Sequence, residues 1–288
     1  YSQDVFNKSY RKPIEKNADL SVKSKLISRI KPFMLRRLKT EVAKELPEKT
    51  TIEVNIDMNE QQSKLYEAVR ATMQKNIREL IATKGFHRSQ IQILSALLKL
   101  RQVCCHPALL QLDDVKSQSI ESAKLDHLLQ MVQDMVEEGR KILIFSQFTT
   151  MLQLIENQIK ILNIPTVKLT GQTKKRDEVI TAFQSGDIPV FLISLKAGGV
   201  GLNLTAADTV IHYDPWWNPA AEDQASDRAW RIGQKKPVFV YKLITNQSIE
   251  EKILALQKNK ANLTQSILSI DHENEVKLSE NDVMSLLN

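Results

Sequence analysis

The chain has 288 residues and is 42% hydrophobic, which is enough to bury one large core or two modest ones. Its 40 Lys and Arg residues against 34 Asp and Glu give a formal net charge of +6, which favours a polyanionic partner without requiring one. No apolar run approaches the roughly 18 residues of a membrane span, and no charged-then-apolar leader opens the chain. We therefore expect a soluble intracellular protein with no membrane partner.

The first part of the chain, residues 1–112, is predicted to be mainly helical. It opens with a polar, basic segment that contains a basic amphipathic stretch, Phe33–Lys39. Residues 50–57 then alternate between apolar and polar as a short strand does. Two helices are predicted next, the first over residues 59–85 and the second over residues 91–105.

The two cysteines, Cys104 and Cys105, are adjacent and cannot form a disulfide with each other without strain. His106 follows them, but no second Cys or His pair stands at the spacing of a zinc site. We therefore expect reduced thiols and no structural metal.

The pattern changes after a polar stretch, residues 113–121, which is predicted to be a linker. Strands and amphipathic helices then alternate over residues 122–247. The predicted helices are 122–138, 149–162, 174–184 and 219–231, and the predicted strands are 142–145, 166–169, 190–194, 209–213 and 238–244. Such alternation indicates an α/β fold with a parallel sheet and helices on both faces. Residues 248–288 are predicted to hold a closing helix and tail, because Ser248 and Glu251 form a capping-box pattern.

Three of the eight glycines, Gly198, Gly199 and Gly201, follow the predicted strand 190–194 closely. Such a cluster lets backbone N–H groups approach a phosphate or ribose at the carboxyl edge of a sheet. Taken alone, the cluster is equally consistent with a tight turn that binds no ligand.

Gln224, Arg228 and Arg231 are spaced four and three residues apart, which places their side chains on one face of the predicted helix. Two guanidiniums beside a glutamine can brace the γ-phosphate of a nucleotide and offset the charge that develops during its cleavage. A solvated, salt-bridged face is the alternative, because Glu222 and Asp227 lie close by. All three tryptophans fall in the same short region, so at least one is expected to meet a ligand or another domain.

Small polar turns follow two other predicted strands, Ser146-Gln147 after the first and Thr170–Thr173 after the second. They suit hydrogen bonds to backbone phosphates rather than the reading of base edges. The sequence has no G-x-x-x-x-G-K-[ST] phosphate loop, and no Asp-Glu pair follows an apolar strand as a Mg²⁺-binding box would. A nucleotide site made from these residues therefore needs a second half from elsewhere.

Five segments resemble helicase motifs IV to VI of the SWI/SNF ATPases, in the order and close to the spacing of that family. They are Lys141–Phe148, Leu169–Gln172, Ser194–Leu204, Asp214–Pro219 and Asp223–Gln234. Upstream, three segments resemble the part of the family that joins its two motor lobes, namely Pro32–Lys39, Leu46-Pro47 and Leu100–Pro107. The helix from Ser248 resembles the brace that closes the second lobe. Two positions depart from the common pattern: Trp230 stands where histidine is usual, and Leu195 where threonine is usual.

The resemblance implies a RecA-like second motor lobe of an ATP-dependent double-stranded-DNA translocase, whose first lobe holds ATP with Mg²⁺. It implies that Arg228 and Arg231 are arginine fingers and that Gln224 acts with them. It also implies a loop that couples nucleotide to DNA, made by Gly199, Gly201 and Asn203. Six residues match positions where the family touches the DNA backbone: Ser146, Gln147, Gly171, Ser194, Lys196 and Trp217.

The implied partners are duplex DNA and the first RecA-like lobe of the same polypeptide, and we expect no ATP hydrolysis from this chain alone. We favour a bacterial cytoplasm over a nucleus. A rival interpretation is a non-catalytic scaffold lobe that binds DNA or protein, which sequence upstream of Tyr1 would decide. A dinucleotide-binding oxidoreductase fits poorly, because its glycines follow the first strand of the sheet, whereas here they follow the third of the α/β part.

Overall fold

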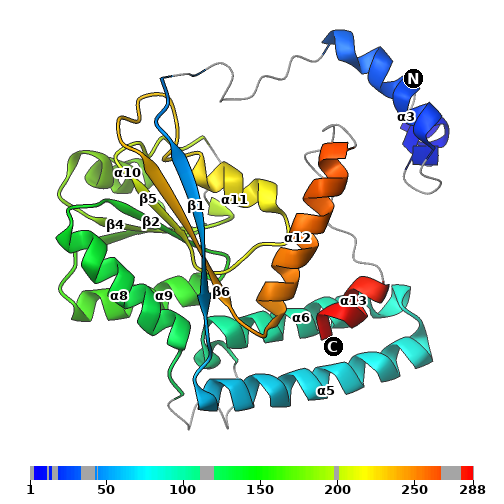
Figure 1. Cartoon of the computed structure of the whole chain (residues 1–288), viewed down its shortest axis with the longest axis horizontal. Helices are drawn as coiled ribbons and strands as arrows, with labels where there is room; N and C mark the ends of the chain where they lie inside the picture. The colour runs from blue at the N-terminus through cyan, green and yellow to red at the C-terminus, as the bar shows by residue number, and fades with distance from the viewer. Residues whose placement is uncertain are drawn as a thin grey trace. The chain divides into compact units, whose positions relative to one another are not determined.

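A computed structural model of the chain describes residues 3–11, 13–14, 19–33, 43, 45–110, 120–197, 201–266 and 280–287. The chain divides into two compact units, Tyr1–Glu45 and Leu46–Asn288 (Figure 1). The predicted linker, residues 113–121, lies almost wholly outside the described residues.

Most of the described residues of the first unit are helical. It contains α1 (Gln3–Phe6), a π-helical turn η1 (Asn7–Arg11), α3 (Leu20–Ile30) and a 3-10 turn η2 (Lys31–Phe33). Asp19 caps α3, because its carboxylate accepts hydrogen bonds from the backbone N–H groups of Ser21 at 3.0 Å and Val22 at 3.1 Å. The predicted amphipathic stretch Phe33–Lys39 lies outside the described residues apart from its first residue.

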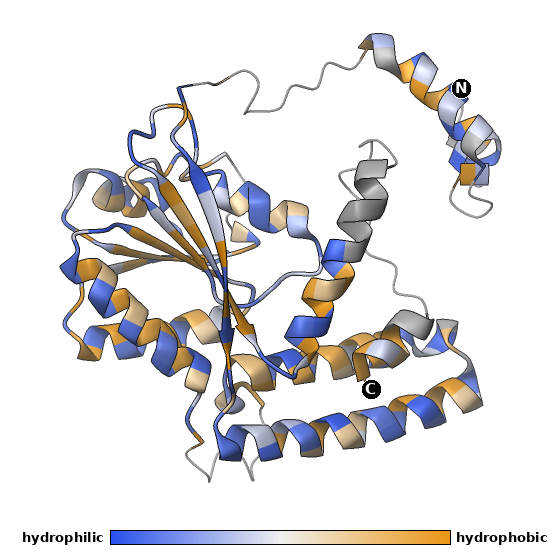
Figure 2. Ribbon diagram, in the orientation of Figure 1, coloured by the Kyte–Doolittle hydropathy of each residue, from blue (hydrophilic) through white to orange (hydrophobic). Residues whose placement is uncertain are grey.

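The second unit is built on a parallel sheet of six strands, ordered β1-β6-β5-β2-β4-β3. The strands are β1 (Lys49–Ile56), β2 (Ile142–Ser146), β3 (Thr166–Leu169), β4 (Val190–Ser194), β5 (Thr209–His212) and β6 (Val238–Thr245). Every residue of β2, β4 and β5 is buried, and these central strands are the most apolar part of the sheet (Figure 2). Strands buried on both faces need continuous apolar runs, so the α/β prediction is confirmed.

One strand of the sheet comes from outside the predicted α/β part. β1 pairs in parallel with β6 along its whole length, from Lys49 opposite Val238 to Ile56 opposite Thr245. The sequence predicted the strand and its alternation, but it grouped residues 1–112 as a separate, mainly helical segment. The structure differs because a parallel partner can lie far along the chain, and nothing local to the strand reveals it.

Helices cover both faces of the sheet. α8 (Ala123–Glu137) and α9 (Thr149–Ile161) pack on one face, while α10 (Arg176–Ser185) and α11 (Pro219–Ser226) pack on the other (Figure 1). Leu128 and Ile155 are fully buried on the first face, and Phe183 and Ala229 on the second.

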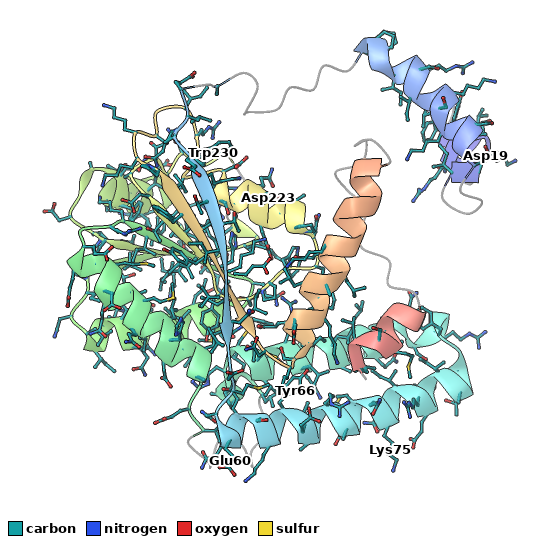
Figure 3. The ribbon with its side chains drawn as sticks, in the orientation of Figure 1. Asp19, Glu60, Tyr66, Lys75, Asp223 and Trp230 are labelled. Carbon is teal, nitrogen blue, oxygen red and sulfur yellow. The ribbon has the colours of Figure 1, made fainter. Side chains whose placement is uncertain are left out.

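A group of helices packs beside the carboxyl ends of the strands. It contains α5 (Glu60–Lys84), α6 (Gln90–Cys105), α12 (Ile249–Ser266) and α13 (Glu280–Leu287), with 3-10 turns η3 (His87–Ser89) and η4 (Pro107–Leu109). Asn59 caps α5 as predicted, and Gly85 ends that helix with a φ of 77°. Tyr66 of α5 points toward α12, and its hydroxyl accepts a hydrogen bond from the Ile249 backbone N–H at 2.7 Å (Figure 3).

The helix predicted over residues 219–231 is shorter than expected, because α11 ends at Ser226. Residues 227–231 form turns and bends. The loop after β4 and the Gln234 side chain hold this segment, because the Arg228 carbonyl accepts from the Leu204 N–H at 3.0 Å and the Ala229 carbonyl accepts from the Gln234 side chain at 3.0 Å. The prediction that Arg228 and Arg231 share a helical face with Gln224 is wrong.

Candidate functional site

The two arginines predicted to act on a nucleotide lie close together in the turns that follow α11. Arg228 is only 5% exposed, whereas Arg231 is exposed. Burial lowers the pKa of the Arg228 guanidinium, and the positive charge of Arg231 lowers it further. Two of the Arg228 nitrogens, Nε and Nη1, are buried with no hydrogen-bond partner among the described residues. A buried, unsatisfied cation is costly, so this guanidinium suits an anion that arrives from outside.

The loop after β4 runs alongside these arginines. Leu204 donates its N–H to the Arg228 carbonyl, and Arg231 Nη1 lies 3.5 Å from the Leu202 carbonyl oxygen. Gly201 has a φ of 35°, and Asn203 is exposed. The predicted coupling loop and the predicted arginines are thus neighbours, although Gly199 lies outside the described residues.

The arginine segment, residues 227–234, lies beside the amino ends of the strands. The Trp230 indole donates to the carbonyl of Pro47, which precedes β1, at 2.7 Å. Gln234 Nε2 donates to the carbonyl of Ala207, which precedes β5, at 2.7 Å. Gln224, by contrast, is exposed on α11.

The two predicted polar turns and the start of the loop after β4 meet at the opposite, carboxyl edge of the sheet. β2, β4 and β3 are consecutive in the sheet and parallel, so the turns that follow them lie side by side. Gly171 and Lys196 are exposed there, and Gln147 is half-buried. The loop after β4 therefore begins at this edge and passes to the arginines, so that one segment joins the two groups of predicted site residues.

Two of the residues predicted to touch DNA are enclosed rather than exposed. The Ser146 hydroxyl is fully buried and donates to Asp214 Oδ1 at 2.5 Å, and it accepts from the Phe148 N–H at 3.1 Å. Ser194 is 4% exposed, and its hydroxyl accepts from the Ala197 N–H at 3.3 Å. Both hydroxyls fix the turns that carry Gln147 and Lys196.

A buried cluster that the sequence reasoning missed braces this edge. Arg101 of α6 is 1% exposed and donates from Nη1 to Gln147 Oε1 at 2.9 Å. Its Nη2 atom donates to the Pro215 carbonyl and lies 3.5 Å from Asp214 Oδ2. Burial raises the pKa of the Asp214 carboxyl to about 6, while the Arg101 charge and the Ser146 hydrogen bond counter that rise. The available signal was a charged residue, Arg101, on the face of a helix that is otherwise apolar.

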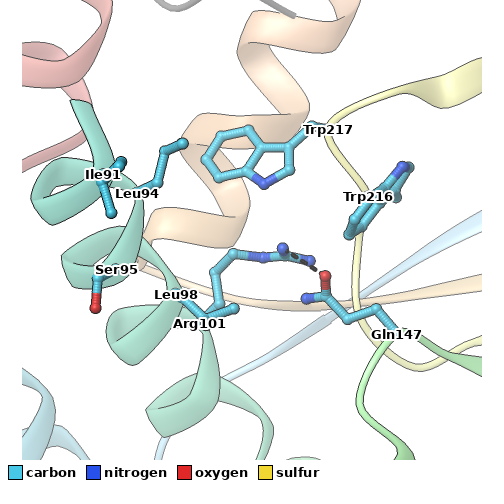
Figure 4. Close-up of a pocket in the computed structure, with 8 residues that line it drawn as sticks. All are labelled: Ile91, Leu94, Ser95, Leu98, Arg101, Gln147, Trp216 and Trp217. Atoms are coloured by element: carbon cyan, nitrogen blue, oxygen red, sulfur yellow. Dashed lines mark hydrogen bonds between the residues drawn. The ribbon is translucent and has the colours of Figure 1, made fainter. Parts of the chain in front are cut away.

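Two tryptophans flank the same cluster. The Arg101 guanidinium carbon lies 5.6 Å from the ring centroid of Trp216 and 5.4 Å from that of Trp217, within cation–π range. These rings, Arg101, Gln147 and the apolar side chains of α6 line a pocket of about 390 Å³ (Figure 4). Trp217, predicted to face DNA, is therefore half-buried against Arg101 at the carboxyl edge.

Among the described residues there is no group of three or more His, Cys, Asp or Glu side chains that could hold a metal ion. Cys104 and Cys105 are free thiols, fully buried, and burial raises the pKa of Cys104 to about 12. None of the helices in the described part of the chain has the length and apolar character that crossing a membrane requires.

Comparison with known proteins shows the family of the chain. The model of the helicase conserved C-terminal domain matches residues 123–233, and that of the SNF2-related domain matches residues 1–109. The chain is 40% identical over 273 residues to a putative ATP-dependent helicase/translocase, YwqA, of Bacillus subtilis, covering 93% of this chain and 29% of that protein. It is 34% identical over 287 residues to the human SWI/SNF-related matrix-associated actin-dependent regulator of chromatin subfamily A member 1, covering 93% of this chain and 27% of the relative. The chain thus spans less than a third of these curated relatives.

Solved structures give the same picture. The C-terminal domain of the Sulfolobus solfataricus SWI2/SNF2 ATPase matches with a TM-score of 0.60 and 35% identity, over 78% of this chain and 91% of that domain. The SWI2/SNF2 ATPase core of the same organism in complex with double-stranded DNA matches with a TM-score of 0.63 and 36% identity, over 93% of this chain and 56% of the core.

Proposed function

Because the chain belongs to the SNF2 family of helicase-like ATPases, we propose that it is the second motor lobe of an ATP-dependent translocase on double-stranded DNA. The observation that carries the proposal is the buried Arg228 guanidinium, which has two unpartnered nitrogens beside the exposed Arg231. Such a pair suits the polyphosphate of a nucleotide presented by another domain.

On the nucleotide side, Arg228 and Arg231 would hold the γ-phosphate, with the loop from Gly201 to Asn203 next to them. Gln224 would act from the exposed surface of α11. Bound ATP with Mg²⁺ supplies the phosphoanhydride bond whose cleavage drives the motor, and the Mg²⁺ ligands belong to the first lobe. The two guanidiniums neutralise negative charge that builds up on the phosphate oxygens. Burial has already stripped the Arg228 guanidinium of water, so its contact with the phosphate costs no further dehydration of this side chain.

On the DNA side, the carboxyl edge of β2, β4 and β3 would meet the phosphate backbone through Gly171, Lys196 and Trp217, next to the turn that holds Gln147. An open glycine turn and a lysine suit phosphate contacts, which carry no sequence information. The double-stranded DNA in the related archaeal core supports this partner. Ser146 and Ser194 would act indirectly, because their hydroxyls are already bonded within the chain.

The experiment is DNA-stimulated ATPase of the full-length polypeptide with Arg228→Ala, Arg231→Ala and an exposed control, Arg88→Ala. We expect each finger variant to lose about 10³-fold or more in turnover while duplex binding persists, and the control to keep its rate. Turnover within a few-fold of wild type in both finger variants would rule out their assignment. Absence of any DNA-stimulated ATPase in the full-length wild type would instead favour the scaffold alternative.

A further inference from the structure

A single buried guanidinium connects three elements that meet at the carboxyl edge. Arg101 belongs to α6 and is 1% exposed. It donates to the side chain of Gln147, in the turn after β2, and to the carbonyl of Pro215, in the loop after β5. Figure 4 shows the guanidinium below the Trp217 ring and next to the Gln147 amide, with Trp216 to the right.

The polar groups around this guanidinium hold each other in fixed positions. Asp214 Oδ2 lies 3.5 Å from Arg101 Nη2, and Asp214 Oδ1 accepts from the Ser146 hydroxyl and from the Gln147 N–H at 3.3 Å. Gln147 Oε1 accepts from Arg101, and Gln147 Nε2 is buried with no hydrogen-bond partner among the described residues. A planar guanidinium with several donors can bond to these groups at once, whereas a lysine ammonium is a single point of charge.

We propose that Arg101 is the positioning residue of the DNA-facing edge: it fixes Gln147 and Trp217 relative to each other and ties both to α6. The inference rests on the proposed function only for what the edge binds. Arg101 itself touches no DNA, because it is enclosed by the residues that it orients. A displacement of α6 would then move Gln147 and Trp217 as well, so that α6 and the DNA-facing edge of the sheet move together.

The test uses the 288-residue chain and a fluorescent 20-base-pair duplex at several salt concentrations. Arg101→Met removes the guanidinium, and Lys99→Met removes an exposed cation two residues away on the same helix as a matched control. Both changes remove one positive charge, so their general electrostatic effect is comparable. We expect Arg101→Met to weaken duplex binding about tenfold, as for loss of one charge-assisted hydrogen bond, and Lys99→Met to change it about twofold or less.

Two further variants separate positioning from simple charge or stability. Arg101→Lys restores the positive charge without the planar set of guanidinium donors, so we expect the affinity for the duplex to stay low. Recovery of wild-type affinity overturns the proposal. The double variant Arg101→Met with Trp217→Ala should bind the duplex with about the affinity of whichever single variant binds it more weakly, because both changes remove the same contact. Fully additive losses also overturn it.

A readout without DNA keeps the inference separate from the proposed function. Acrylamide quenching of tryptophan fluorescence should increase in Arg101→Met and stay unchanged in Lys99→Met, since Trp216 and Trp217 lose their packing partner; equal quenching in the two variants overturns the proposal. If Arg101→Met does not fold, Arg101→Met with Asp214→Asn removes both buried charges and takes its place. If Trp217→Ala binds the duplex as tightly as wild type does, the assignment of this edge to DNA is wrong. The quenching result still decides whether Arg101 positions the tryptophans.

Discussion

Replacement of Arg228 by methionine should make the free chain more stable while it disables the motor. The side chain is 5% exposed, and its Nε and Nη1 atoms have no hydrogen-bond partner in the described part of the chain. A buried donor left unsatisfied costs about 1–3 kcal/mol, and the nearby positive charge of Arg231 adds to that cost. Methionine keeps most of the aliphatic length and removes the charge, so we expect the free energy of unfolding to rise by about 1–3 kcal/mol.

The assay is urea unfolding of the 288-residue chain, followed by circular dichroism, with Arg231→Met as the control. Arg231 is exposed, so its replacement should change the free energy of unfolding by about 0.5 kcal/mol or less. Both variants should lose DNA-stimulated ATPase in the full-length protein. A stability loss of about 1 kcal/mol or more in Arg228→Met would falsify this reasoning, because it would mean that the guanidinium is satisfied before any ligand arrives.

Three other changes test how the fold holds the site. Lys124 and Glu250 form an ion pair whose side chains are 1% and 0% exposed. Lys124→Met leaves the Glu250 charge buried and unpaired, so it should lower the free energy of unfolding by about 3–5 kcal/mol, whereas the double variant Lys124→Met with Glu250→Gln should lose far less. Equal losses in a urea titration would refute a buried charge as the cause. Tyr66→Phe removes the acceptor of the Ile249 N–H and should cost about 1–3 kcal/mol in the same titration, and a loss below about 0.5 kcal/mol would contradict the hydrogen bond. His212 is fully buried, and burial lowers its pKa to about 4, so the unfolded chain takes up a proton below about pH 6.5 that the folded chain refuses. Stability is therefore lost as pH falls from about 6.5 to 4. His212→Asn lacks this titration, so its free energy of unfolding should improve relative to that of wild type by about 3 kcal/mol as pH falls over that range. A difference between the two free energies that does not change with pH would show that the imidazole is not buried in its neutral form.

The sequence by itself determined most of the elements and the family. β3 and β4 lie at their predicted bounds, and α5 begins after the predicted cap Asn59, because apolar spacing and capping are local properties. The predicted parallel sheet likewise implied that the turns holding Gln147 and Gly171 share one edge, because the carboxyl ends of parallel strands lie together. Motif resemblance then gave the family, which the comparisons confirm.

Only the tertiary structure decided what distant segments do to one another. α11 ends at Ser226, and the segment after it is held against the loop after β4, whose Leu204 N–H bonds to the Arg228 carbonyl from far upstream in the sequence. β1 joins the sheet by pairing with a strand that begins at Val238. Arg101 has a role only because folding surrounds its guanidinium with groups from two other loops. Spacing along a chain determines which face of a helix or strand a side chain occupies, but burial and hydrogen-bond partners depend on what packs against that face.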